Sequence, residues 1–194
     1  MSLSGVSTTQ IIIVIAVVGV IVAAALAIWF SSRKRRTEKL RTQFGGPEYT
    51  RAMKEGGSQR KAEAALDKRA ERVEALHIRP LSSADRARFV DSWTRVQARF
   101  VDGPGGAVTD ADQVLGDVMS TRGYPMSNFE QRAADISVDY PLVLENYRSA
   151  HEIAIRQTHG QASTEELRQA MIHYRTLFDE LVREPEMARA AAAS

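Results

Sequence analysis

The longest apolar stretch of the chain comprises residues 11–30, twenty positions without a charged side chain. A helix rises about 1.5 Å per residue, so this length spans about 30 Å, the thickness of the hydrocarbon core of a bilayer. We therefore predict one N-terminal transmembrane helix. Gly19, Ala23 and Ala27 share one face of it, a spacing that favours self-association but also reflects how common Gly and Ala are in such helices.

Charge differs strongly between the two sides of this stretch. Residues 1–10 carry no charged side chain, whereas residues 31–61 carry ten Lys or Arg and three Glu. Positive flanks stay on the cytoplasmic side, so we expect an outside N-terminus, a cytoplasmic C-terminal domain and the lipid bilayer as a partner. A cleaved signal peptide is the alternative, which the uncharged start disfavours. The expected membrane-interface residues are Trp29, Phe30, Arg33, Lys34, Arg35 and Arg36.

Further along the chain, apolar residues recur every three or four positions, the period of amphipathic helices. Glycine and proline interrupt the period at 103–106, 122–125 and 160, and strand-type alternation is absent from the pattern. The sequence therefore predicts an all-α fold: one transmembrane helix, a basic juxtamembrane segment and a compact multi-helix domain. The apolar positions are Phe89, Trp93, Val96 and Phe100; Val108, Ala111, Leu115 and Val118; Phe129, Ala133 and Ile136; Leu144, Tyr147, Ala150, Ala154 and Ile155; and Leu167, Ala170, Met171, Tyr174, Leu177, Phe178 and Leu181.

Short polar residues before these stretches predict where the helices begin. We expect Ser58, Ser82 or Ser83, and Ser127 to be N-terminal caps, and Ser163 with Glu166 to form a capping box. The predicted organisation is a short extracytoplasmic N-terminus over 1–10, the transmembrane helix over 11–30, basic juxtamembrane and stalk helices over 31–78, a helical domain over 79–183 and a disordered tail over 184–194.

Candidate catalytic and metal-binding patterns are incomplete. His151-Glu152 resembles the start of a zinc-protease helix, but position 155 is Ile155 instead of the second histidine. The Glu74 and His77 pair has the spacing used in di-iron bundles but occurs once. Cysteine is absent, and the basic segment holds too few aromatic residues for nucleic-acid binding. We predict no catalytic residues, metal or cofactor, and enzymatic activity is left open.

One group of residues is a candidate ligand pocket. It consists of Trp93, Tyr124, Tyr140, Tyr147, Arg148 and His151, which combine aromatic surface with a cation and a titratable ring. The alternative interpretation is that the aromatic members pack in the core. Glu145 and Glu152 lie one turn on either side of Arg148, so ion pairing along this helix flank is expected to be the role of that polar cluster.

Several short segments between Leu40 and Val182 resemble an uncharacterised family of small single-pass membrane proteins of bacteria. The resemblance rests on Arg79-Pro80-Leu81-Ser82, Trp93 with 96–102, Arg122-Gly123-Tyr124-Pro125, 129–135, and Tyr147-Arg148 with Ala150-His151. It implies a bacterial inner-membrane location and no particular reaction, ligand or partner. The leading functional hypothesis is a membrane-anchored cytoplasmic binding or scaffolding module for an unknown protein partner. The alternative is a domain that binds a small molecule or a lipid headgroup.

Overall fold

The computed structural model describes residues 37–183, together with Val18, Ile21, Val22, Ala24, Ser31, Lys34 and Arg35. The chain forms two compact units, Met1–Thr42 and Gln43–Ser194. In the first unit, residues 37–42 are helical, and the Thr42 hydroxyl donates a hydrogen bond of 3.0 Å to the Glu38 carbonyl. The second unit contains the candidate pocket residues.

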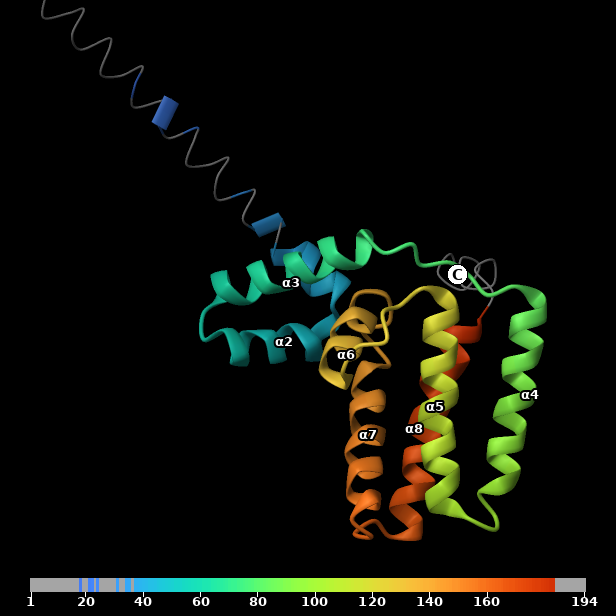
Figure 1. The fold of residues 1–194 in the computed structure, drawn as a ribbon. Coiled ribbons are helices and arrows are strands. Elements are labelled where there is room, and N and C mark those ends of the chain that lie inside the picture. The colour runs from blue at the N-terminus through green and yellow to red at the C-terminus, as the bar shows by residue number, and fades with distance from the viewer. Residues whose placement is uncertain are drawn as a thin grey trace, which may run out of the picture. The chain divides into compact units, whose positions relative to one another are not determined.

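Seven helices make up the described part of the second unit (Figure 1). Residues 43–183 contain no strand, so the predicted all-α fold is confirmed. The helices are α2 (Gly45–Gly56), α3 (Gln59–Glu74), α4 (Ser83–Arg99), α5 (Pro104–Arg122), α6 (Phe129–Asp139), α7 (Leu144–Thr158) and α8 (Thr164–Val182).

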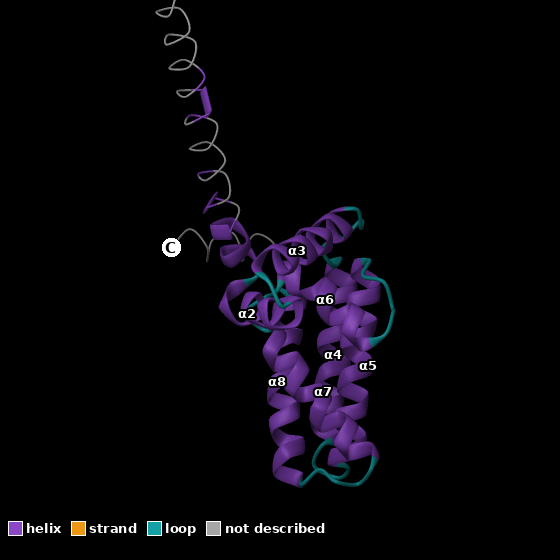
Figure 2. Cartoon of the chain, turned by 90° about the vertical axis from the view of Figure 1, so that its left-hand side faces the viewer, coloured by secondary structure: helices purple, strands orange, loops and turns teal. Residues whose placement is uncertain are grey.

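The long helices α4, α5, α7 and α8 run alongside one another as a bundle, and α2, α3 and α6 gather at one end of it (Figures 1 and 2). The core of the bundle is apolar, and α8 contributes to it along its whole length, from Leu167 to Leu181. Trp93 of α4 stacks on Phe178 of α8, with ring centroids 4.6 Å apart and planes 16° apart. This contact joins the peripheral helix α4 to the centre of the bundle.

The helix ends largely follow the predicted capping pattern. The side chains of Ser58, Ser82 and Ser163 each accept a backbone hydrogen bond at a helix start, and Ser163 with Glu166 forms the capping box. The prediction for α6 was wrong, because Asn128 caps this helix instead of Ser127. Asn128 has an extended backbone that aims its side-chain oxygen at the Gln131 amide, at 2.9 Å.

The end of α5 requires a glycine. Gly123 has φ +104°, and a Cβ at this position would lie 2.8 Å from the His77 carbonyl oxygen. The positive φ belongs to the end of α5, whereas the close contact comes from the segment before α4, whose Arg79 amide donates to the Arg122 carbonyl at 2.9 Å. The predicted interruption at 122–125 is confirmed, and Gly123 is its left-handed residue.

The apolar face of α7 differs from its prediction at one position. Ile155 was assigned to the buried face, but 48% of it is exposed, and Ile153 is buried instead. Ile155 lies one turn from His151, on a face of α7 that does not enter the main hydrophobic core.

The predicted transmembrane helix is corrected by the structure. No helix among the described residues combines the length and apolar character that crossing a bilayer requires. Each of the helices from α2 to α8 contains several charged side chains, which a segment that crosses a bilayer does not tolerate. Of residues 11–30 themselves, only Val18, Ile21, Val22 and Ala24 are described.

Several other sequence predictions fall on residues outside the described part of the chain. These are the extracytoplasmic segment 1–10, the tail 184–194, the interface residues Trp29, Phe30, Arg33 and Arg36, and the small-residue face of Gly19, Ala23 and Ala27. The predicted stalk over 31–78 includes α2 and α3, which belong to the same compact unit as the bundle.

Candidate functional site

The six candidate pocket residues lie in different parts of the second unit. Trp93, Tyr124 and Tyr147 are buried among the core side chains. Tyr140 lies at the end of α6, where its hydroxyl accepts a hydrogen bond from Arg122. Arg148 and His151, one turn apart on α7, are the two that line a common hollow.

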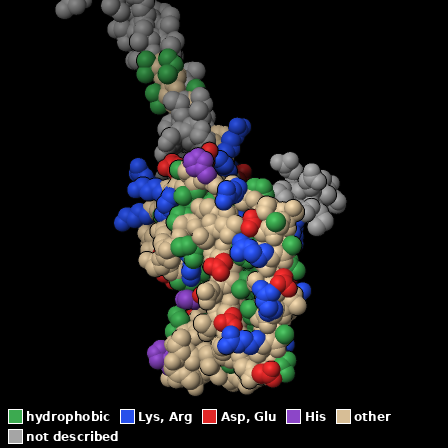
Figure 3. Space-filling view, turned by 45° about the vertical axis from the view of Figure 1, so that its right-hand side comes forward, with side chains coloured by type: hydrophobic (Ala, Val, Ile, Leu, Met, Phe, Trp, Pro, Cys, Tyr) green, Lys and Arg blue, Asp and Glu red, His purple; other side chains and the backbone are tan. Residues whose placement is uncertain are grey.

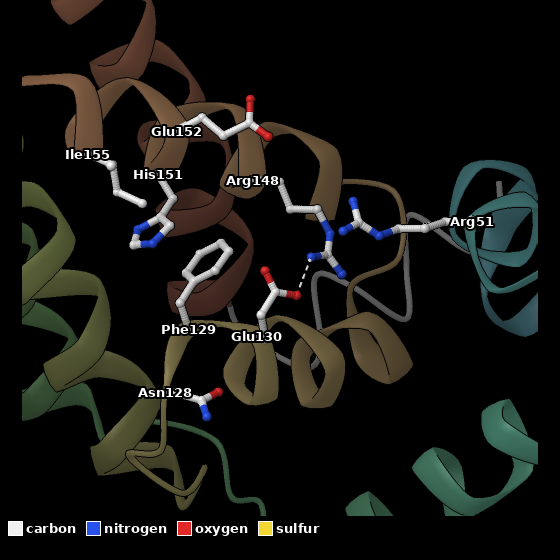
Figure 4. Close-up of a pocket in the computed structure, with 8 residues that line it drawn as sticks. All are labelled: Arg51, Asn128, Phe129, Glu130, Arg148, His151, Glu152 and Ile155. Atoms are coloured by element: carbon white, nitrogen blue, oxygen red, sulfur yellow. Dashed lines mark hydrogen bonds and ion pairs between the residues drawn. The ribbon is translucent and has the colours of Figure 1, made fainter. Parts of the chain in front are cut away.

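This hollow lies between α2, α6 and α7 and has a volume of about 360 Å³ (Figure 4). Such a volume is at the small end of the range typical of ligand sites, roughly 300–1,000 Å³. The residues that line the hollow are Arg51 from α2; Asn128, Phe129 and Glu130 at the start of α6; and Arg148, His151, Glu152 and Ile155 from α7. The hollow is therefore lined by apolar, cationic and anionic side chains.

Arg148 is the most buried charged residue of this site, with 6% of its surface exposed. Its Nη1 lies 3.3 Å from Glu130 Oε2 and its Nη2 lies 3.5 Å from Glu48 Oε1. Close charge-assisted contacts between such groups measure about 2.7–2.9 Å, so both ion pairs are loose. Its Nε is buried and has no hydrogen-bond partner among the described residues. A buried guanidinium is thus held with incomplete hydrogen bonding.

The two glutamates beside Arg148 differ in their exposure to solvent. The Glu48 carboxylate is buried and also accepts a hydrogen bond of 2.6 Å from Arg69 Nη1. The Glu130 side chain is 71% exposed, so water can solvate it when it leaves Arg148. Glu130 is consequently the partner of Arg148 that another anion replaces most easily.

Arg51 faces Arg148 across the hollow. In Figure 4 the two guanidinium groups point toward one another, from α2 and α7. Arg51 Nε donates a hydrogen bond of 2.9 Å to Glu55 on its own helix. Against the lowering effect of burial, the carboxylates of Glu55, Glu48 and Glu130 raise the pKa of Arg51, so its charge is already partly compensated.

His151 and Phe129 form an aromatic wall of the hollow. Their ring centroids are 3.5 Å apart, and the ring planes differ by 7°. Burial lowers the pKa of His151 below its usual value, and Arg132 adds to this effect, while Asp112, Glu130 and Glu152 partly oppose it. His151 Nδ1 is buried without a hydrogen-bond partner among the described residues. The ring therefore favours the neutral form.

A polar cluster lies behind this wall, inside the bundle. Asp112 of α5 raises the pKa values of Tyr147 and Tyr174, in addition to the larger effect of burial, and Arg132 opposes both shifts. Within the described residues, Asp112 Oδ1, Arg132 Nε and the Tyr174 hydroxyl make no hydrogen bond. Burial of such groups costs free energy, and they keep the inner side of His151 polar.

Sequence reasoning missed most of the hollow. It assigned Arg148 to ion pairs along α7, but the observed partners Glu48 and Glu130 come from α2 and α6. Arg51 and Asn128 were not proposed for any site, and no local signal in the sequence connects them with α7. Only the tertiary packing brings positions separated by about a hundred residues together.

The hollow has no features of a metal centre. Within residues 37–183, no three His, Asp or Glu side chains are placed so that they could hold a metal ion together.

Comparison with known proteins finds no matching family model, no matching curated protein and no matching solved structure. The resemblance to a family of small bacterial membrane proteins therefore stays a prediction.

Proposed function

We propose that the second unit is a binding module for a small organic anion, held in the hollow between α2, α6 and α7. The observation that carries this proposal is Arg148, a buried guanidinium with two loose ion pairs and an unpartnered Nε. A planar carboxylate or a phosphate presents two oxygens to this fork and improves its hydrogen bonding.

The other lining residues favour a ligand with an apolar or aromatic portion beside its anionic group. Phe129 and Ile155 supply apolar surface, while Arg51 supplies a second positive charge. Glu130 and Glu152 balance the two arginines, so the hollow as a whole is close to neutral. Affinity must therefore come from geometry at Arg148 and from apolar contact, more than from long-range attraction.

The scaffolding hypothesis receives less support from the described surface. A protein-binding face is commonly a contiguous apolar patch. On the face shown in Figure 3, hydrophobic side chains occur in small groups among charged ones. The most exposed large apolar residues, Val101 (84%) and Leu142 (83%), lie on loops at α4–α5 and α6–α7. A protein partner stays a prediction from the sequence.

The test is calorimetric titration of the full-length chain with phenyl phosphate and with benzoate. We expect saturable binding of at least one probe, weakened about tenfold or more by Arg148→Lys, because lysine cannot form a bidentate contact. Arg175→Lys is the matched control, since Arg175 is an exposed residue of α8. It should bind like the wild type.

A second variant tests the role assigned to Glu130. Glu130→Gln removes the carboxylate that competes for Arg148, so affinity should rise, by about fivefold for a gain of about 1 kcal/mol.

Two further titrations distinguish the source of a phosphate ligand: one with glycerol phosphate in solution, and one with vesicles that contain phosphatidylglycerol. Absence of saturable binding to all of these probes contradicts the proposed function, as does equal affinity of the wild type and Arg148→Lys.

A further inference from the structure

The α2–α3 pair is attached to the rest of the second unit differently from the other helices. The main hydrophobic core takes all of its members, including the partly buried ones, from residues 78–182. The buried apolar residues of α2 and α3, such as Tyr49, Leu66 and Val73, do not belong to that core. The pair is therefore a separate layer at the end of the bundle (Figures 1 and 2).

Polar contacts fasten this layer to α6 and α7. Arg72 of α3 donates to the buried Asp135 of α6, at 2.9 Å from its Nε. Arg69 Nη1 donates to the Ser137 hydroxyl at 3.2 Å. The contact with α7 is the longest of the three, with Arg148 Nη2 lying 3.5 Å from Glu48 Oε1. The α2 end of the layer is thus less firmly held than the α3 end.

The hollow spans this weak boundary. Arg51 belongs to α2, whereas Arg148 belongs to α7, and their guanidinium groups face each other (Figure 4). An anion that replaces Glu130 at Arg148 Nη1 leaves the pair of Nη2 with Glu48 in place. The same anion lies within the hollow that Arg51 lines, so it is placed to contact a cation of α2 and a cation of α7 at once.

From this arrangement we infer that the bound anion regulates the docking of the α2–α3 layer, holding α2 against α7 through Arg51 and Arg148. This inference rests on the proposed function, since it needs a ligand in the same hollow. Binding of the ligand and docking of the layer depend on the same contacts, and such coupling is reciprocal. The ligand must therefore stabilise the docked layer, and any loss of docking must lower the affinity for the ligand.

The first measurement is hydrogen exchange of the full-length chain, read by mass spectrometry with and without saturating phenyl phosphate. We expect exchange of residues 45–74 to slow about fivefold or more on binding. Arg51→Gln should still bind the probe through Arg148 but lose this protection. If phenyl phosphate binds and the exchange of 45–74 is unchanged or faster, the inference is overturned while the proposed function stands.

The second measurement uses reciprocity at a residue outside the hollow. Arg72→Gln removes the contact between α3 and Asp135 of α6, so the affinity for phenyl phosphate should fall about fivefold. The control is Arg60→Gln, an exposed position of the same helix, which should bind like the wild type. Equal affinity of all three proteins overturns the inference, and no binding by any of them overturns the proposed function as well.

Discussion

At the scale of single residues, the chemistry of α7 depends on what surrounds each side chain. Arg148 and His151 occupy neighbouring turns of one helix, yet burial has opposite consequences for them. The buried guanidinium of Arg148 needs hydrogen-bond and ion-pair partners, whereas burial lowers the pKa of His151 and favours its neutral form. One turn of helix thus combines a guanidinium with a titratable ring.

The lowered pKa of His151 predicts a pH dependence of stability. In the unfolded chain histidine titrates near 6.5, so as the pH falls through that value the unfolded state takes up a proton more readily than the folded state. The free energy of unfolding should therefore decrease between about pH 7.5 and 5.5. Urea denaturation at the two pH values measures this decrease.

The matched variant for this prediction is His151→Gln, which removes the titrating ring. Its free energy of unfolding should decrease less than that of the wild type over the same pH range. An equal or larger decrease in the variant would show that other groups cause the dependence, and that the charged neighbours Asp112, Glu130 and Glu152 offset the burial of His151.

At the scale of helices, a local side-chain cap marks where α3, α4, α6 and α8 start. The capping box of α8 joins Ser163 and Glu166 in both directions, with the Ser163 amide 2.8 Å from Glu166 Oε2. These contacts satisfy amides that the first turn leaves without partners. The same hydrogen bonds from Ser163, together with Arg156, lower the pKa of Glu166 to about 2.

Ser163→Ala should consequently destabilise the protein by about 1 kcal/mol, the usual cost of losing a serine cap. Chemical denaturation at neutral pH gives the value. Ser120→Ala is the control, because Ser120 is an exposed residue of α5 whose replacement is expected to change stability by less than about 0.5 kcal/mol. Similar effects of the two substitutions would contradict the role of the cap.

At the scale of the whole second unit, the core depends on contacts between helices that are distant in sequence. The stack of Trp93 on Phe178 joins α4 to α8 across eighty-five positions of the chain. When a large aromatic side chain at such a junction is truncated, its neighbours relax only partly and a cavity remains.

Replacement of Trp93 tests this junction. Trp93→Ala should cost about 3–5 kcal/mol of unfolding free energy, and Trp93→Phe clearly less, because a ring remains against Phe178. Thermal and urea unfolding both report the loss. Val101→Ala, at a largely exposed position, is the reference for an apolar truncation outside the core, and a Trp93→Ala protein as stable as this reference would contradict the assignment.

The sequence by itself determined the helical class, most helix boundaries and the apolar faces, because these depend on spacing and capping within one or a few turns. The caps at Ser58, Ser82 and Ser163 and the left-handed end at Gly123 are local in this sense. Its largest error concerned residues 11–30, where hydropathy alone predicted a membrane-spanning helix that the described residues do not provide.

Only the tertiary structure decided which side chains share a site. It buried Trp93, Tyr124 and Tyr147 in the core and placed Arg148 opposite Arg51. The physical reason is that a helical period specifies which face is buried but not which helix covers it. Side chains from α2, α6 and α7 meet only after the bundle has packed, so the hollow and its incompletely hydrogen-bonded guanidinium have no signature along the chain.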